Sequence, residues 1–196
     1  MKTNTSFKKV LLPTTLLAFA GFAQETGKTT EGVYTSIKQS NCVVASSSEL
    51  VEDAEIDFLK MSCPALGGYE VEISGGDIRY DLKLHYQGEN IALPYVGAFH
   101  DMGSEVIEWR YSRVDTNEVF GKSIKYQALI YRINSDWTQE DGTLKNVSTL
   151  YVVRLDGKNS CAVAALSTLN NPGGDLNKLA VAAAEDNTLK CLSLAD

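Results

Sequence analysis

The sequence lacks the short motifs of most cofactor-dependent and nucleophilic enzymes. It has no G-x-x-x-x-G-K-[ST] loop and no G-x-G-x-x-G segment, so nucleotide cofactors are disfavoured. It has no G-x-S-x-G nucleophile elbow, which disfavours a serine hydrolase of the usual kind. We therefore expect no cofactor.

Histidine is scarce, and closely spaced cysteine pairs are absent. The chain has two histidines, His85 and His100, and no C-x-x-C, so the paired ligand spacing of a zinc site is missing. The acidic stretch 49–57 lacks the glycine and the spacing of an EF-hand loop, and a solvated loop is the better interpretation. The sequence thus predicts no metal site.

Long apolar runs are absent beyond the first 23 residues. Three lysines precede an apolar run over residues 10–19, and small residues end the segment at Ala23, as in a secretory signal peptide. A membrane anchor is the alternative, but the run is shorter than the ~20 apolar residues that cross a bilayer. We expect residues 1–23 to be a cleaved signal peptide, the protein to be periplasmic or secreted, and the mature chain to have no membrane span.

Positive charge is in short supply once that segment is removed. The chain has 18 Lys and Arg against 25 Asp and Glu, and loss of the three signal lysines takes the net charge from −7 to −10 over 173 residues. Nucleic acid and anionic membranes are repelled by such a surface and are not expected partners. The acidity is compatible with a cationic protein partner, although it also serves to keep exported proteins soluble.

The four cysteines all lie after the signal. An even number in an oxidising compartment is most simply interpreted as two disulfides, and three pairings are possible. We favour Cys42–Cys63 and Cys161–Cys191, because each pair would tie a local unit at one end of the chain. Cysteines used in this way are not available as nucleophiles.

Strand patterns fill most of the chain. Residues 24–32 are polar and aperiodic, which predicts a flexible leader before a single β-rich domain over 33–196. Apolar and polar residues alternate over 69–73 and 78–86, and Ser74-Gly75-Gly76-Asp77 between them predicts a hairpin turn with glycines at positive φ. Further strands are predicted at 33–37, 41–45, 107–111, 125–133, 149–155 and 161–166.

A polar loop and a helix complete the predicted organisation. The loop covers 134–148, and Asp175 is a good N-cap for a helix over 176–186. The apolar face of this helix would comprise Leu176, Leu179, Ala180, Ala183 and Ala184. The predicted fold class is β-dominated α+β, an antiparallel sandwich or strongly curved sheet with one C-terminal helix and two disulfides.

Short motifs spread over most of the mature chain carry a family resemblance. They are Cys63-Pro64 with Gly67-Gly68-Tyr69, Gly76-Asp77-Ile78-Arg79, Gly97-Ala98-Phe99, Gly103 before Glu108-Trp109-Arg110, Ala128-Leu129-Ile130-Tyr131-Arg132, and a helix ending near Cys191. In this combination the chain resembles small exported bacterial proteins of unknown function. The resemblance brings no activity and no catalytic residue with it.

Candidate binding residues come from two segments: His100, Asp101, Glu108, Trp109 and Arg110 from the first, and Trp137 from the second. His100 would stand at the rim of the sheet as a ligand-binding or pH-sensitive group, or as a loop histidine satisfied by the backbone. Trp137 would be a contact residue on its loop or a cover for an open end of the sheet.

Two functions are compatible with these residues. The first is a non-enzymatic binding or inhibitor-type protein, whose partner would be a cationic protein such as lysozyme, or a glycan. The alternative is a small cell-envelope hydrolase with paired carboxylates, in which Glu108 acts beside Trp109 as a sugar platform. Glu108 is explained more simply as the solvent-facing neighbour of Arg110 in an alternating strand, so the sequence favours the binding protein.

Overall fold

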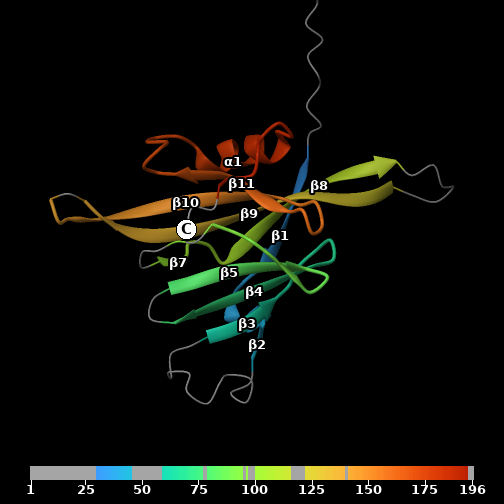
Figure 1. Ribbon diagram of the computed structural model, residues 1–196, viewed down its shortest axis with the longest axis horizontal. Helices are drawn as coiled ribbons and strands as arrows, with labels where there is room; N and C mark the ends of the chain where they lie inside the picture. The colour runs from blue at the N-terminus through green and yellow to red at the C-terminus, as the bar shows by residue number, and fades with distance from the viewer. Residues whose placement is uncertain are drawn as a thin grey trace, which may run out of the picture.

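The computed structural model describes residues 30–45, 59–76, 79–94, 96, 100–115, 122–139 and 141–193. Within these residues the chain forms one curled sheet and one α-helix near the C-terminus, which confirms the predicted fold class (Figure 1). The elements are β1 (Glu31–Ser36), a 3-10 turn η1 (Gln39–Asn41), β2 (Val43–Val44), β3 (Leu59–Cys63), β4 (Tyr69–Gly76), β5 (Arg79–Tyr86), β6 (Glu89–Ile91), β7 (His100–Met102), β8 (Val106–Asp115), β9 (Lys122–Thr138), β10 (Leu144–Arg154), β11 (Cys161–Ser167) and α1 (Leu176–Glu185).

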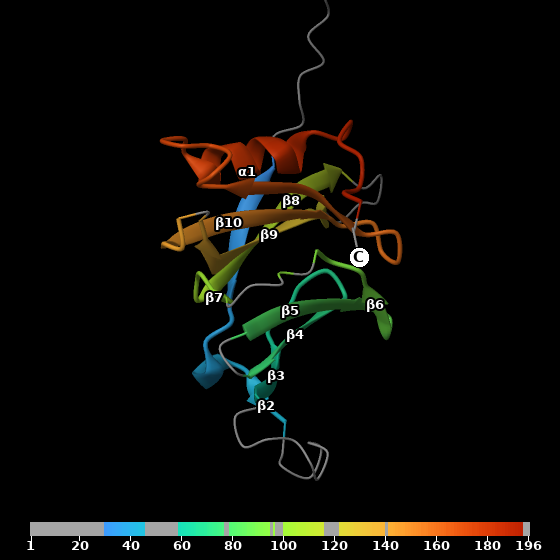
Figure 2. The ribbon, with the colours of Figure 1, turned by 60° about the vertical axis from the view of Figure 1, so that its left-hand side comes forward.

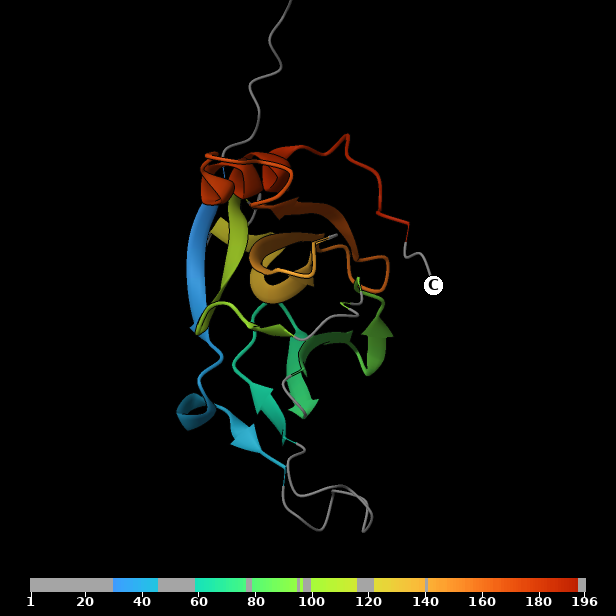
Figure 3. The same cartoon turned by 90° about the vertical axis from the view of Figure 1, so that its left-hand side faces the viewer.

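The sheet has two parts that meet at β7. The strand order is β1-β8-β9-β7-β5-β4-β3-β2, with β10 on the other edge of β9, β11 beyond β10, and β6 beside β5. The described pairings between these strands are antiparallel except the one between β5 and β7, a single parallel pair of Arg79 and His100. Figure 2 shows β2–β6 as one part, with α1 over the β8–β11 part, and Figure 3 shows how strongly the sheet curls.

The β4–β5 hairpin follows the alternation in the sequence. Val71 lies opposite Leu84 and Ile73 opposite Leu82, all four buried, while Glu72 and Lys83 pair on the other face. Because successive side chains of a strand point to opposite faces, this pattern buries one face in the core.

The turn of this hairpin is tighter than predicted. Ser74, Gly75 and Gly76 belong to β4, and the connection is confined to residues 77 and 78, which lie outside the described residues. Gly75 does not have a positive φ. A Cβ there would lie 2.4 Å from the Arg79 carbonyl oxygen, so close approach of the two strands is what requires this glycine.

The prediction of a loop over 134–148 is wrong. β9 continues to Thr138 and β10 begins at Leu144, so most of this segment forms an antiparallel ladder with Trp137 opposite Lys145. Its polar composition reflects a hairpin that is solvated near its tip. In Figure 1 this orange hairpin projects beyond the rest of the molecule.

Other predicted boundaries shift by a few residues. Thr30 is buried and β1 begins at Glu31, so the last residues of the predicted leader are part of the fold. The predicted strand at 41–45 shortens to β2, because η1 occupies Gln39–Asn41. Several predicted segments lie outside the described residues: the predicted signal peptide over 1–23, residues 24–29 of the predicted leader, and the acidic stretch 49–57.

Helix α1 covers the second face of the sheet. Asp175 caps it as predicted, accepting a hydrogen bond from the Lys178 backbone N–H at 3.1 Å. Leu176 and Ala180 are buried against β9–β11, but Leu179, predicted for the same face, is 39% exposed. The β9–β11 region is therefore buried on both faces.

Both predicted disulfides are confirmed. Cys42 bonds to Cys63 and Cys161 bonds to Cys191, and no free cysteine is left among the four. The first joins the β2 region to β3, and the second joins the C-terminal segment after α1 to β11.

Candidate functional site

Trp109 is a core residue. Its side chain is fully buried in β8, between the rings of Tyr69 at 6.3 Å and Tyr126 at 6.2 Å, and its Nε1–H donates to Thr35 Oγ1 at 2.8 Å. A tryptophan held in this way has no face for a ligand. Its predicted role as a contact residue or sugar platform is wrong.

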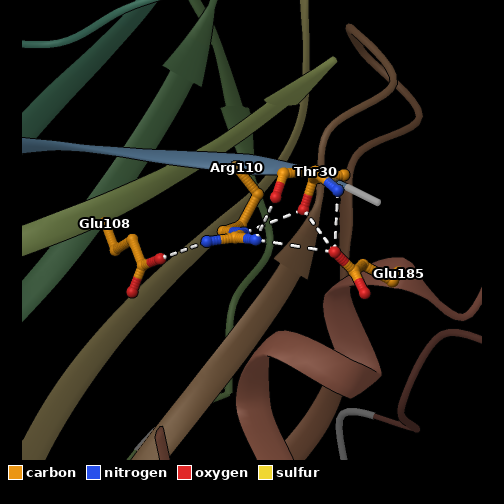
Figure 4. Close-up of polar contacts among 4 residues, drawn as sticks. All are labelled: Thr30, Glu108, Arg110 and Glu185. Atoms are coloured by element: carbon orange, nitrogen blue, oxygen red, sulfur yellow. Dashed lines mark hydrogen bonds and ion pairs between the residues drawn. The ribbon is translucent and has the colours of Figure 1, made fainter. Parts of the chain in front are cut away.

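Arg110 is buried as well, at 9% exposure, although alternation places it on the polar face of β8. That face of β8 is covered by α1 and by the start of β1, and so it is not exposed to solvent. The Arg110 guanidinium donates to Glu108 Oε1 at 2.8 Å, to Thr30 Oγ1 at 2.8 Å and to the Thr30 carbonyl, and lies 3.5 Å from Glu185 Oε1 (Figure 4). We call these four residues the Arg110 cluster.

The paired-carboxylate alternative finds no support in this cluster. Glu108 and Glu185 come from β8 and α1, and both contact the guanidinium of Arg110. Glycoside hydrolysis needs one carboxyl to hold a proton and the other to face the sugar. Two carboxylates held by the same arginine act instead as structural ligands of its charge.

His100 is buried in β7 rather than standing on a loop at the rim. Its Nε2 lies 3.2 Å from Oδ1 of Asp81 on β5, while Asp101 points the other way and is exposed. Sequence reasoning missed Asp81, because the two residues are 19 positions apart and come from strands that pair at a single point. The His100–Asp81 pair lies at the junction of the two parts of the sheet.

Trp137, like Asp101, is a candidate residue whose side chain is exposed. It is 57% exposed and lines a hollow of about 460 Å³ on the projecting β9–β10 hairpin. The other described lining residues are Gln139, Asp141, Lys145 and Leu169. None of these four residues was singled out from the sequence. Leu169 lies beyond β11, and the three polar residues are typical of a surface loop.

A carboxylate and an ammonium lie beside Trp137. Asp141 Oδ1 accepts from the Thr143 hydroxyl at 2.6 Å and from its backbone N–H at 2.9 Å, and these hydrogen bonds hold the pKa of Asp141 below its usual value. Lys145 supplies the opposite charge across the hairpin. An indole face flanked by a carboxylate, an ammonium and an amide can stack on an apolar face and hydrogen-bond at its edges.

Glu108 also lines a second hollow, a groove of about 320 Å³ beside the start of α1. Its floor includes Ile130 and Leu150, and its polar rim includes Tyr34 and Arg132. Burial and the neighbouring Glu108 carboxylate raise the pKa of Tyr34. Apart from Glu108, no residue of this groove was predicted, because they come from four different strands and the helix.

In the part of the chain that the structure describes, no three His, Cys, Asp or Glu side chains come together to hold a metal ion. No helix in those residues is both long and apolar enough to cross a membrane. Comparisons with protein-family models, with curated proteins and with solved structures gave no match for this chain.

Proposed function

We propose that the protein is a non-enzymatic binding module of the periplasm or the extracellular space. The two disulfides support an oxidising compartment, where such bonds form and persist. The partner is a cationic protein or a glycan, and the contact is made by the β9–β10 hairpin.

The exposure of Trp137 is the observation that carries this proposal. A large aromatic side chain on a projecting hairpin gives no stability to the core, whereas tryptophan is among the residues that contribute most to binding surfaces. The two strands of the hairpin pair without interruption, from Ala128 opposite Arg154 to Thr138 opposite Leu144. The hairpin therefore presents Trp137 on a rigid element.

The charge balance supports a cationic protein in particular. The full chain carries a net charge of −7, and an acidic protein attracts a basic partner over long range and speeds the encounter. A glycan would instead use the indole face of Trp137 for stacking and the polar groups around it for hydrogen bonds.

The experiment measures binding of the disulfide-bonded protein to immobilised lysozyme and to a β-1,4-linked N-acetylglucosamine oligosaccharide. We expect the wild type to bind one of these probes, and Trp137→Ala to weaken that binding at least tenfold. Ile124→Ala is the matched control, because Ile124 is 54% exposed at the opposite end of β9. Binding of neither probe, or equal binding by Trp137→Ala, contradicts the proposal.

Fluorescence gives a second measurement in the same experiment. The chain has two tryptophans, and Trp109 is shielded from solvent, so the oligosaccharide, which has no fluorescence of its own, changes the emission of Trp137 alone when it binds at the hairpin. The emission change expected for the wild type is absent in Trp137→Phe.

A further inference from the structure

The groove beside α1 places opposite charges on either side of an apolar floor. Glu108 on β8 lies opposite Tyr34 on β1 and, on its other side, opposite Ile130 on β9. Arg132 lies two residues further along β9 than Ile130, on the same face of the strand. Ile130 on β9 lies next to both charged residues, Leu150 on β10 lies opposite Arg132, and Asn177 of α1 closes the Arg132 side. The volume of about 320 Å³ is at the small end of the range for ligand pockets.

Arg132 is held in place by neutral groups alone. It donates to Ser148 Oγ at 2.6 Å and to Asn177 Oδ1 at 2.9 Å, and within the described residues it forms no ion pair. Arg110 on β8, in contrast, contacts two carboxylates. No carboxylate of the described residues therefore compensates the positive charge of Arg132, and donors of its guanidinium remain available for a carboxylate.

Glu108 supplies the negative side of the groove. Its Oε1 accepts from Arg110 at 2.8 Å, and the carboxylate retains lone pairs for a further donor. Diagonal neighbours across an antiparallel pair are about 7–8 Å apart, a span that a short chain with one charge at each end can bridge.

We propose that this groove binds a short peptide with apolar side chains. Arg132 takes the terminal carboxylate, Glu108 takes the terminal ammonium, and the side chains lie on Ile130 and Leu150. A zwitterion matches both charges, whereas a polyanion is repelled by the net charge of −7. This site is separate from the Trp137 hollow, with which it shares no lining residue.

Calorimetric titration of the wild-type protein with the dipeptide Leu-Leu tests the proposal. Binding is expected, with at least tenfold weaker binding of the amide of Leu-Leu, which lacks the carboxylate, and of its N-acetyl form, which lacks the ammonium. Absence of Leu-Leu binding overturns the proposal. Equal binding of either blocked form, or of glucuronate, also overturns it, the last in favour of an acidic sugar.

Variants locate the site. Arg132→Gln is expected to weaken Leu-Leu binding at least tenfold, while Arg113→Gln, an exposed arginine further along β8, leaves it unchanged. Equal binding by wild type and Arg132→Gln overturns the placement. If Arg132→Gln does not fold, the comparison of blocked and free dipeptides on the wild type still decides. Trp137→Ala is expected to bind Leu-Leu normally, so this test is independent of the proposed function.

Discussion

Thr30 and Glu185 lie 155 residues apart in the sequence and are joined by two hydrogen bonds to one carboxylate oxygen. Glu185 Oε1 accepts from the backbone N–H of Thr30 at 2.7 Å and from its hydroxyl at 3.0 Å. Arg110 lies beneath both residues and donates to the Thr30 hydroxyl and carbonyl. The start of β1 and the end of α1 are thus fastened to the same residue of β8.

Removal of Arg110 tests this fastening. Arg110→Ala leaves Glu108 and Glu185 largely buried without their cation, and removal of one partner of a buried ion pair typically costs about 3 kcal/mol or more. We expect the free energy of unfolding in urea to fall by about this amount. Arg113→Ala is the control, since its ion pair with Glu31 is exposed and its loss should leave the unfolding midpoint unchanged.

Gly32 allows the Arg110 cluster to form. A Cβ at this position would lie 2.6 Å from Glu108 Oε1 and 2.8 Å from Arg110 Nη1, closer than atoms pack. Gly32→Ala is therefore expected to destabilise the protein by about 1–3 kcal/mol, the usual cost of overpacking. In the Arg110→Ala background the same substitution should cost much less, because the arginine is gone and Glu108, no longer held by it, can move away from the new methyl group.

Thermal or urea unfolding of the four proteins of this double-mutant cycle measures the coupling. Gly174→Ala is a matched control, because a Cβ there has its nearest contact at 3.4 Å and this glycine has no positive φ. Purely additive effects of Gly32→Ala and Arg110→Ala would show that the glycine serves some other purpose.

Glu72 makes stability depend on pH. Burial raises its pKa, but hydrogen bonds from Lys60 at 3.1 Å and Lys83 at 3.3 Å outweigh burial and hold the pKa below 4.5. A lowered pKa in the folded state stabilises the protein above the unfolded value of 4.5, and this contribution is lost as the pH falls through the folded value.

We therefore expect Glu72→Gln to be less stable than the wild type at pH 7, by up to about 1 kcal/mol, and equal to it in strong acid. Free energies of unfolding measured from pH 3 to 7 give the difference curve. Glu89→Gln, which removes an exposed ion pair with Lys158, provides the comparison. A difference for Glu72→Gln that stays constant over this range would contradict the assignment.

The disulfides should contribute separately to stability. Cys161→Ser with Cys191→Ser opens a loop of sequence separation 30, and the chain-entropy relation gives a loss of about 3–4 kcal/mol. The C-terminal segment should also exchange amide hydrogens faster, because it would then be held mainly by two hydrogen bonds. Arg154 donates to the Leu189 carbonyl at 2.8 Å, and the Leu192 backbone N–H donates to the Ala162 carbonyl at 2.8 Å. Thiol titration of the unreduced wild type is expected to find no free cysteine, and any free thiol would contradict the pairing.

Local patterns account for the elements that were predicted well. The alternation in β4 and β5 and the N-cap Asp175 before α1 each involve residues within a few positions of one another. The disulfide pairing was predicted from the same locality, since each bond closes a short segment at one end of the chain. None of these features needs knowledge of a distant contact.

By itself the sequence determined that strands dominate, where most of them lie and that one capped helix follows, because period-two alternation and capping are local properties. It favoured the cysteine pairing that the structure has, without excluding the other two. Only the tertiary structure decided which faces of the strands are buried and which are exposed. It buried Trp109 and Arg110 on opposite sides of β8 and turned the polar 134–148 segment into a hairpin that presents Trp137. The physical reason is that burial depends on what covers a strand. Here α1 and the start of β1 cover Arg110, and the core that contains Tyr69 covers Trp109, and all of these are distant from β8 in the chain.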